Sequence, residues 1–155
     1  MPDAKVRPAR RGDEPALREV LASIELFPAD MLDGMIAPFH SGGQGHRWLV
    51  VEDGEAPVGF AYCEPERMTD GTHNMLAIGV RADRQGFGLG TALIEALERD
   101  LVSQGQRVLL IETSGSDAYA RTRSLYARRG YVGQARIPEF YAAGEDKIVF
   151  WKKLA

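Results

Sequence analysis

The sequence predicts an α/β fold built on one mixed β-sheet. Two short helical segments come early, three strand-like segments joined by tight turns follow, and a strand–helix–strand crossover lies beyond them. The expected order is β-α-α-β-β-β-α-β-α-β-β, with about six or seven mostly antiparallel strands and about four helices. The length of 155 residues predicts a single domain over residues 1–155.

The first third of the chain predicts one strand and two helices. "KVRPAR" (5–10) reads as a short opening strand, and Asp13 is expected to cap the helix that follows. The apolar residues of this helix recur at helical spacing: Leu17, Val20, Leu21 and Ile24. Pro28 interrupts the pattern, and residues 29–39 predict a second short helix.

The remaining elements alternate between strand and helix periods. Three strands in succession are expected at "RWLVVED", "APVGFAYCEP" and "HNMLAIGV". A glycine-rich turn opens a helix with leucines four residues apart: Leu89, Leu93, Leu97 and Leu101. "RVLLIETS" predicts a buried strand, residues 116–130 a helix, and "YVGQARI" and "KIVFWKKL" the last strands, with a long loop over 138–146.

Composition excludes several classes of protein. The formal charge of −3 argues against nucleic acid as the main partner, and the sequence has no apolar run long enough to predict a membrane span or signal peptide. Cys63 is the only cysteine, which predicts a reducing compartment, the cytoplasm. The three histidines lie far apart, so no metal site is expected.

Three alternating glycines, Gly86, Gly88 and Gly90, separate a predicted strand from a predicted helix. Amides at the start of a helix lack intrahelical acceptors and carry partial positive charge, so the turn predicts a phosphate site. The Walker pattern is excluded because no lysine follows Gly90, and the Rossmann spacing does not fit. The alternative is a tight β–α connection in which the glycines serve packing.

The stretch Gln85–Gly90 has the form Gln/Arg-x-x-Gly-x-Gly, and downstream Leu125-Tyr126-x-x-x-Gly130-Tyr131 follows the next strand. Both motifs, and the order of elements over residues 5–154, resemble the GNAT superfamily of acyl-CoA-dependent N-acetyltransferases. The resemblance implies acetyl-CoA as the donor and a primary amine of a small molecule or peptide as the acceptor.

The resemblance also implies which residues hold the donor. Backbone amides of the turn would bind the pyrophosphate of coenzyme A: Gln85, Gly86, Phe87, Gly88, Leu89, Gly90 and Thr91. The pantetheine arm would pair with Ile78, Gly79 and Val80, and the Val80 N–H would stabilise the negative charge on the thioester oxygen. Gly79 is expected either to mark a bulge that separates this strand from the next or to make room for packing.

For proton transfer, Tyr126 is the expected acid, because a tyrosine is protonated at neutral pH and can donate to the leaving thiolate. Glu112, a charged residue in an apolar strand, is expected to be the base or to be held in an ion pair, and Glu64 is its rival. Tyr119 stands where the family often has an asparagine, which leaves that pantetheine contact open. Cys63 has no histidine nearby in the sequence, which favours direct transfer without a covalent enzyme intermediate.

The resemblance places acceptor binding at the first two helices and the last hairpin, here Phe27, Met31, Phe140 and Tyr141. Glu64, and His73 and Asn74 at the start of the cofactor strand, are also expected to line the acceptor side. Two rival functions are a non-catalytic acyl-CoA-binding module and a nucleotide-dependent oxidoreductase. Neither the identity of the amine nor the choice between monomer and homodimer follows from the sequence.

Overall fold

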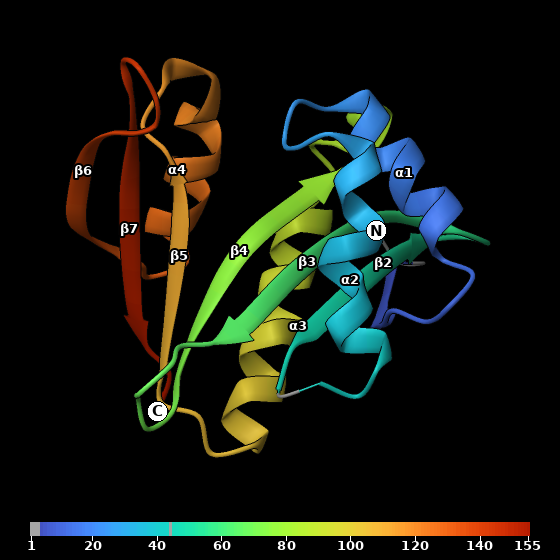
Figure 1. The fold of residues 1–155 in the computed structure, drawn as a ribbon, viewed down its shortest axis with the longest axis horizontal. Helices are drawn as coiled ribbons and strands as arrows, with labels where there is room; N and C mark the ends of the chain where they lie inside the picture. The colour runs from blue at the N-terminus through green and yellow to red at the C-terminus, as the bar shows by residue number, and fades with distance from the viewer. Residues whose placement is uncertain (1–3, 44) are drawn as a thin grey trace.

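In a computed structural model that describes residues 4–43 and 45–155, seven strands form one sheet in the order β1-β2-β3-β4-β5-β7-β6 (Figure 1). The strands are β1 (Ala4–Pro8), β2 (Arg47–Asp53), β3 (Pro57–Pro65), β4 (Thr72–Val80), β5 (Val108–Ser114), β6 (Val132–Ala142) and β7 (Glu145–Lys153). The α-helices are α1 (Glu14–Ser23), α2 (Leu32–His40), α3 (Leu89–Ser103) and α4 (Ala120–Arg128). The predicted α/β class and element order are confirmed.

Helices cover both faces of the sheet, so the core has two parts. The side chains of α1 and α2 pack on one face with Trp48 and Phe60, and the leucines of α3 pack on the other with Tyr126 of α4. The i, i+4 leucine spacing in α3 produces this apolar stripe. None of the helices in the described ranges is long and apolar enough to cross a membrane.

Among the strands of residues 4–43 and 45–155, only one neighbouring pair, β4 and β5, is parallel, and its pairing is short. The ladder runs from Thr72 opposite Val108 to Met75 opposite Ile111, and the two strands then diverge (Figure 1). We call the region between residues 76–80 of β4 and residues 112–114 of β5 the β4–β5 fork. The fork leaves one edge of β4 without a strand partner.

The predicted loop over residues 138–146 is wrong. Strand β6 continues to Ala142, and only residues 143–144 form the turn to β7. Pro138 suggested a loop because proline cannot donate to a ladder, but β6 is the edge strand of the sheet, where this donor is not needed. The pairing with β7 is irregular between Ile137 and Ala142, so the intervening residues bulge out of the ladder.

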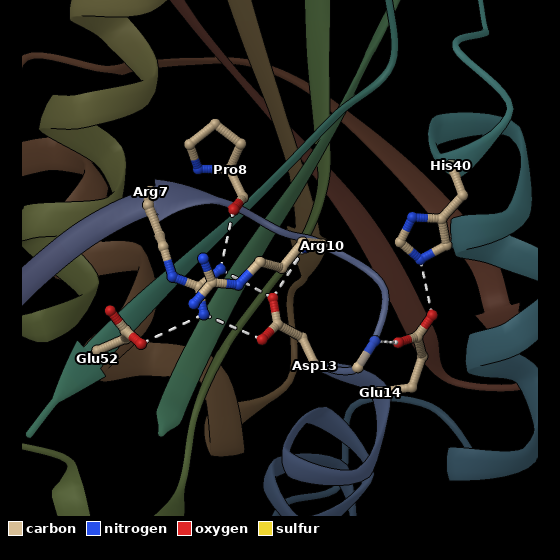
Figure 2. Close-up of polar contacts among 8 residues, drawn as sticks. Arg7, Pro8, Arg10, Asp13, Glu14, His40 and Glu52 are labelled. Atoms are coloured by element: carbon tan, nitrogen blue, oxygen red, sulfur yellow. Dashed lines mark hydrogen bonds and ion pairs between the residues drawn. The ribbon is translucent and has the colours of Figure 1, made fainter. Parts of the chain in front are cut away.

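Asp13 begins α1 as predicted, but its carboxylate does not cap the helix. It accepts hydrogen bonds from the Arg7 guanidinium at 2.9 and 3.0 Å and from the Arg10 amide at 2.9 Å (Figure 2). Arg7 also reaches Glu52 of β2 at 3.2 Å. Burial acts to raise the pKa of Asp13, but these hydrogen bonds outweigh it and hold that pKa below its ordinary value. The network fixes α1 to β1 and β2.

Candidate active site

The glycine turn has a backbone that requires glycine at two positions. Gly86 and Gly88 have φ angles of 86° and 81°, in the left-handed region that L-residues avoid. A Cβ atom at either position would meet no atom within 4 Å, so packing against the protein does not explain these glycines. Gly88 is the N-cap of α3 and Gly90 lies in its first turn. The turn therefore presents bare backbone to open space.

The amides of this turn are free to bind a ligand. The first hydrogen bond of α3 runs from Ala92 N–H to Gly88 O, and in the described part of the chain the amides of residues 86–91 donate to no other backbone group. The side chain of Gln85 donates to Val80 O at 3.0 Å and ties the turn to β4. Free amides at a helix N-terminus fit the phosphate site that the sequence predicts.

The two arginines beside the turn are already paired with carboxylates. Arg81 Nε lies 2.7 Å from Asp83 Oδ1, and Arg84 Nε lies 3.1 Å from Asp53 Oδ2. Phe87, at the tip of the turn, is half exposed. Backbone amides, rather than unpaired arginines, are thus the groups that remain available to an anion at this place.

The free edge of β4 directs two amides into the β4–β5 fork. Arg81 N–H donates to Val58 O of β3 at 2.7 Å. Because N–H groups alternate between the two edges of a strand, the Ile78 and Val80 N–H groups point away from β3 and toward the fork. The structure places both groups where an extended ligand could pair with β4, as in strand addition.

Gly79 does not mark the bulge of β4. The register shifts at Leu76, which is the extra residue between Tyr62 opposite Ala77 and Cys63 opposite Met75. A Cβ atom at Gly79 would lie 2.7 Å from Ile24 Cδ1, so this glycine makes room for the end of α1. The packing alternative for Gly79 is therefore confirmed, and the bulge expected there is wrong.

The end of α1 also holds the segment that leads into the glycine turn. Ser23 Oγ accepts a hydrogen bond from the Ala82 amide at 3.0 Å and donates to Val20 O at 2.8 Å. Together with the contact between Ile24 and Gly79, this bond joins α1 to the C-terminal end of β4 at two points. Sequence reasoning missed Ser23, because nothing in its local pattern marks it.

The Tyr126 ring is buried, and its hydroxyl is left free to donate. The ring packs edge-on against Phe150 with centroids 5.5 Å apart. Within residues 4–43 and 45–155 the hydroxyl has no hydrogen-bond partner, and it is not fully enclosed. Burial, with smaller effects of the Tyr141 and Tyr119 hydroxyls, raises the pKa of Tyr126 well above its ordinary value. The group is protonated at neutral pH, as a general acid must be.

Glu112 is the first residue of β5 beyond the last β4–β5 pair. Its Oε1 lies 2.8 Å from Lys147 Nζ, and its Oε2 accepts from Asn74 Nδ2 at 2.7 Å. Asn74 Nδ2 also donates to Glu66 at 3.2 Å. Both carboxylate oxygens of Glu112 are therefore engaged, so the ion-paired alternative describes the state seen here. Lys147 was missed, because only the strand register reveals it.

The structure separates His73 from Asn74, although the sequence places them side by side. Neighbouring residues of a strand point to opposite faces. Asn74 lies on the face of α1 and α2 with Glu112, whereas His73 lies beneath α3 and accepts a hydrogen bond from Arg47, which pairs with Asp100. Burial lowers the pKa of His73 to about 4, and the Arg47 charge adds to this effect. His73 therefore lies on the opposite face from Glu112, away from the expected acceptor side.

Glu64, the rival base, lies opposite Asn74 in the β3–β4 ladder. Its carboxylate accepts a hydrogen bond from the Tyr62 hydroxyl, and His46 Nδ1 lies 3.9 Å away. With a third of its side chain exposed, Glu64 is the more accessible of the two carboxylates. The structure thus brings both candidate bases to the same face of the sheet.

The large apolar residues expected at the acceptor side, Met31 and three aromatic residues, lie in two places. Phe27 packs edge-on against Phe60, with centroids 6.2 Å apart, and Met31 is half exposed. Phe140 and Tyr141 lie in β6, where their exposed rings are perpendicular at 5.1 Å. Burial, and to a smaller extent the charge of the Glu112 carboxylate, raise the pKa of Tyr141 to about 12. The Phe140 ring lies 4.0 Å from the Nζ of Lys147, the ion-pair partner of Glu112, so this pair of rings lies beside Glu112.

Tyr119 connects the segment between β5 and α4 to the segment after α1. It ends the short 3₁₀ helix η3 (Asp117–Tyr119) before α4, and its hydroxyl donates to Glu25 O at 2.8 Å in the segment after α1. A ring at this position, in place of the asparagine common in the resembled family, spans from the β5–α4 connection to the α1 side.

The seven-stranded mixed sheet, with one forked parallel pair beside a glycine turn, has the architecture of an acetyltransferase. The family model for the acetyltransferase (GNAT) family matches residues 14–131. This match covers most of the chain, so the protein belongs to the GNAT family, and the predicted family is confirmed.

Individual relatives agree with this assignment. An uncharacterized N-acetyltransferase of Methanocaldococcus jannaschii is 31% identical over 84 residues, a match that covers 54% of this chain and 53% of that protein. The chain thus spans about half the length of the curated relative it matches. A crystal structure of a GNAT-family protein from Desulfovibrio desulfuricans is 31% identical, with a TM-score of 0.90 over 98% of this chain and 99% of that one.

An acetyltransferase structure from Salmonella typhimurium, solved with its cofactor acetyl-CoA, has a TM-score of 0.77 at 20% identity and covers 99% of this chain and 95% of that one. At this identity the likeness shows the fold alone.

Proposed function

We propose that this protein transfers an acetyl group from acetyl-CoA directly to a primary amine within a ternary complex. One observation carries the proposal: among the described residues, neither the β4 amides that face the β4–β5 fork nor the Tyr126 hydroxyl has a hydrogen-bond partner. The first can hold a thioester, and the second can protonate a leaving thiolate. The GNAT family assignment supports this chemistry.

The glycine turn and β4 would bind the donor, which supplies an activated acetyl group as a thioester. Amides of residues 86–91 would hold the pyrophosphate, and the Ile78 and Val80 N–H groups would pair with the pantetheine arm. The Val80 N–H would donate to the carbonyl oxygen as negative charge builds on it. The Salmonella relative with bound acetyl-CoA and the open space before Gly86 and Gly88 support this assignment.

Tyr126 would donate its proton to the departing thiolate, since its buried hydroxyl stays protonated. Glu112 would take the proton of the amine, directly or through water, once an acceptor displaces one of its present partners. A covalent route through Cys63 is disfavoured, because burial raises the pKa of its thiol to about 12 and leaves no thiolate at neutral pH. Buried Cys63 also fits the proposed cytoplasmic location.

The acceptor would be a small molecule or peptide with a primary amine. Glu64, Glu66 and Glu112 outnumber the single cation Lys147 in this group of residues, which favours a positively charged acceptor. The exposed rings of Phe140 and Tyr141 would form one wall of the acceptor site.

The test is release of coenzyme A thiol from acetyl-CoA across a panel of small-molecule and peptide amines. We expect turnover with at least one amine and no binding of NAD(P) in a parallel titration. Binding of acetyl-CoA without turnover on any amine would favour the rival acyl-CoA-binding module. Binding of NAD(P) in place of acetyl-CoA would overturn the proposal.

A further inference from the structure

Lys147 already occupies a position that suits an amine. Its ammonium lies 2.8 Å from Glu112 Oε1 and 4.0 Å from the centroid of the Phe140 ring. A carboxylate and the face of an aromatic ring are the two groups that best hold an alkylammonium. The side chain is 11% exposed, so this ammonium is largely shielded from water.

This amine lies beside the proposed reaction centre. Glu112 begins the open part of β5 at the fork. Lys147 lies opposite Ser114 in the β5–β7 ladder, so it borders the part of β5 that lines the fork. Lys147 is the cation that pairs with Glu112 there.

We propose that Lys147 is itself an acceptor, and that the protein acetylates it in cis. This inference rests on the proposed function. Glu112 takes one proton from the Lys147 ammonium, and the neutral Nζ attacks the thioester carbon of acetyl-CoA. A C–N bond forms and the C–S bond breaks. Tyr126 supplies a proton to the thiolate and is reprotonated from solvent. The nitrogen releases its second proton to solvent as the amide forms, and Glu112 loses its proton to solvent through the exposed part of its side chain.

Acetylation of Lys147 would change the site for the acceptors that follow. An acetylated lysine has no charge, so it keeps neither the ion pair with Glu112 nor the cation–π contact with Phe140. Glu112 would then lose one of its two present partners and be free to bind and deprotonate an external amine. The modification would act as a priming step for the enzyme.

Lys152 provides a matched comparison on the same chain. It is also paired with a carboxylate, with Nζ 3.0 Å from Glu98 Oε2, but it lies on the α3 side of the sheet. Its side chain is 25% exposed, more than twice the value for Lys147. Uncatalysed reaction with acetyl-CoA should therefore favour Lys152, whereas transfer at the fork should favour Lys147. The chain has only two further lysines, Lys5 and Lys153.

The experiment incubates the purified protein with acetyl-CoA that carries an isotopically heavy acetyl group, without added amine. Mass spectrometry of intact protein and of peptides then follows each of the four lysines with time. We expect one acetyl group on Lys147, added at least about tenfold faster than on Lys152 because bound reactants are close and oriented. Tyr126→Phe should slow labelling of Lys147 by on the order of 100-fold and leave the other lysines unchanged.

Two further measurements complete the test. Lys147→Arg should abolish the fast phase, because its guanidinium keeps a charge but does not accept acetyl. A Tyr126→Phe chain mixed with wild-type protein should stay unlabelled at Lys147, which would show transfer in cis. Equal labelling of Lys147 and Lys152, labelling unaffected by Tyr126→Phe, or labelling of the variant by wild type would each overturn the inference.

The amine panel separates this inference from the proposed function. Turnover on an amine with no acetyl on Lys147 would overturn the self-acetylation alone. Absence of both would overturn the proposed function and the inference with it.

Discussion

The substitution Gly88→Ala tests whether the glycine turn is a ligand site or only a connection. Gly88 has a φ of 81°, and an added Cβ would meet no protein atom within 4 Å. The fold would therefore lose only the cost of the left-handed conformation, about 1–2 kcal/mol. Reduced entropy of the unfolded chain offsets about 0.4–1 kcal/mol of this. The expected net loss is about 1 kcal/mol, or about 2–4 °C in Tm.

Binding should suffer more than folding. If the pyrophosphate of coenzyme A lies against the free amides of residues 86–91, the new methyl group stands between backbone and ligand. We expect acetyl-CoA to bind at least about tenfold more weakly, which corresponds to about 1.4 kcal/mol. Isothermal titration calorimetry with acetyl-CoA measures the affinity, and thermal unfolding measures the stability.

Gly105→Ala is the matched control. Gly105 follows the other end of α3, has a φ of 74° and also has open space around its Cβ position. It should lose the same stability and keep the same affinity for acetyl-CoA. If Gly88→Ala binds acetyl-CoA as tightly as Gly105→Ala does, the glycines serve only to form the tight connection between β4 and α3, and the phosphate assignment fails.

Three further predictions concern side chains. Tyr126→Phe should lower kcat by about 100-fold and leave the affinity for acetyl-CoA nearly unchanged, as steady-state kinetics and calorimetry can show. Glu112→Gln should lower kcat/KM by at least about tenfold, and Glu64→Gln should have a smaller effect in the same amine assay. The unfolded chain binds a proton at His73 near pH 6.5, but the folded chain binds it only near pH 4. As the pH is lowered from 6.5 to 4, the free energy of unfolding should therefore fall by roughly 3 kcal/mol. Urea unfolding of wild type and His73→Gln across this window measures the difference.

Each of these predictions has a result that contradicts it. An unchanged kcat in Tyr126→Phe removes Tyr126 from the acid role. A larger loss in Glu64→Gln than in Glu112→Gln transfers the base role to Glu64. Parallel pH profiles of stability for wild type and His73→Gln would show that His73 does not titrate differently in the two states.

The sequence predicted the backbone of this site better than its side-chain partners. The strand before Gly86 and the helix after Gly90 follow from local chain chemistry, because left-handed turns need glycine and apolar periods mark the flanking elements. The pairing of Glu112 with Lys147 joins β5 to β7, and only the strand register brings these residues together. No spacing along the chain contains that information.

Two errors have different physical origins. The alternation of side chains along a strand already separates His73 from Asn74, so this error came from grouping neighbours without applying the period of two. Strand β6 was shortened because Pro138 usually ends a strand, and the position of β6 at the sheet edge, which removes this penalty, is a property of the whole fold.

The two contacts between α1 and the end of β4 have a thermodynamic consequence. Ser23 holds the Ala82 amide, and Ile24 fills the space above Gly79, so the segment that would meet the acceptor is attached to the strand that would hold the donor. A shift of one segment must therefore strain or relax the other. Linkage makes such coupling reciprocal. If bound donor changes the affinity for the acceptor by some factor, bound acceptor changes the affinity for the donor by the same factor. If both substrates bind as proposed, their binding is a joint equilibrium whose coupling free energy would pass through the end of one short helix.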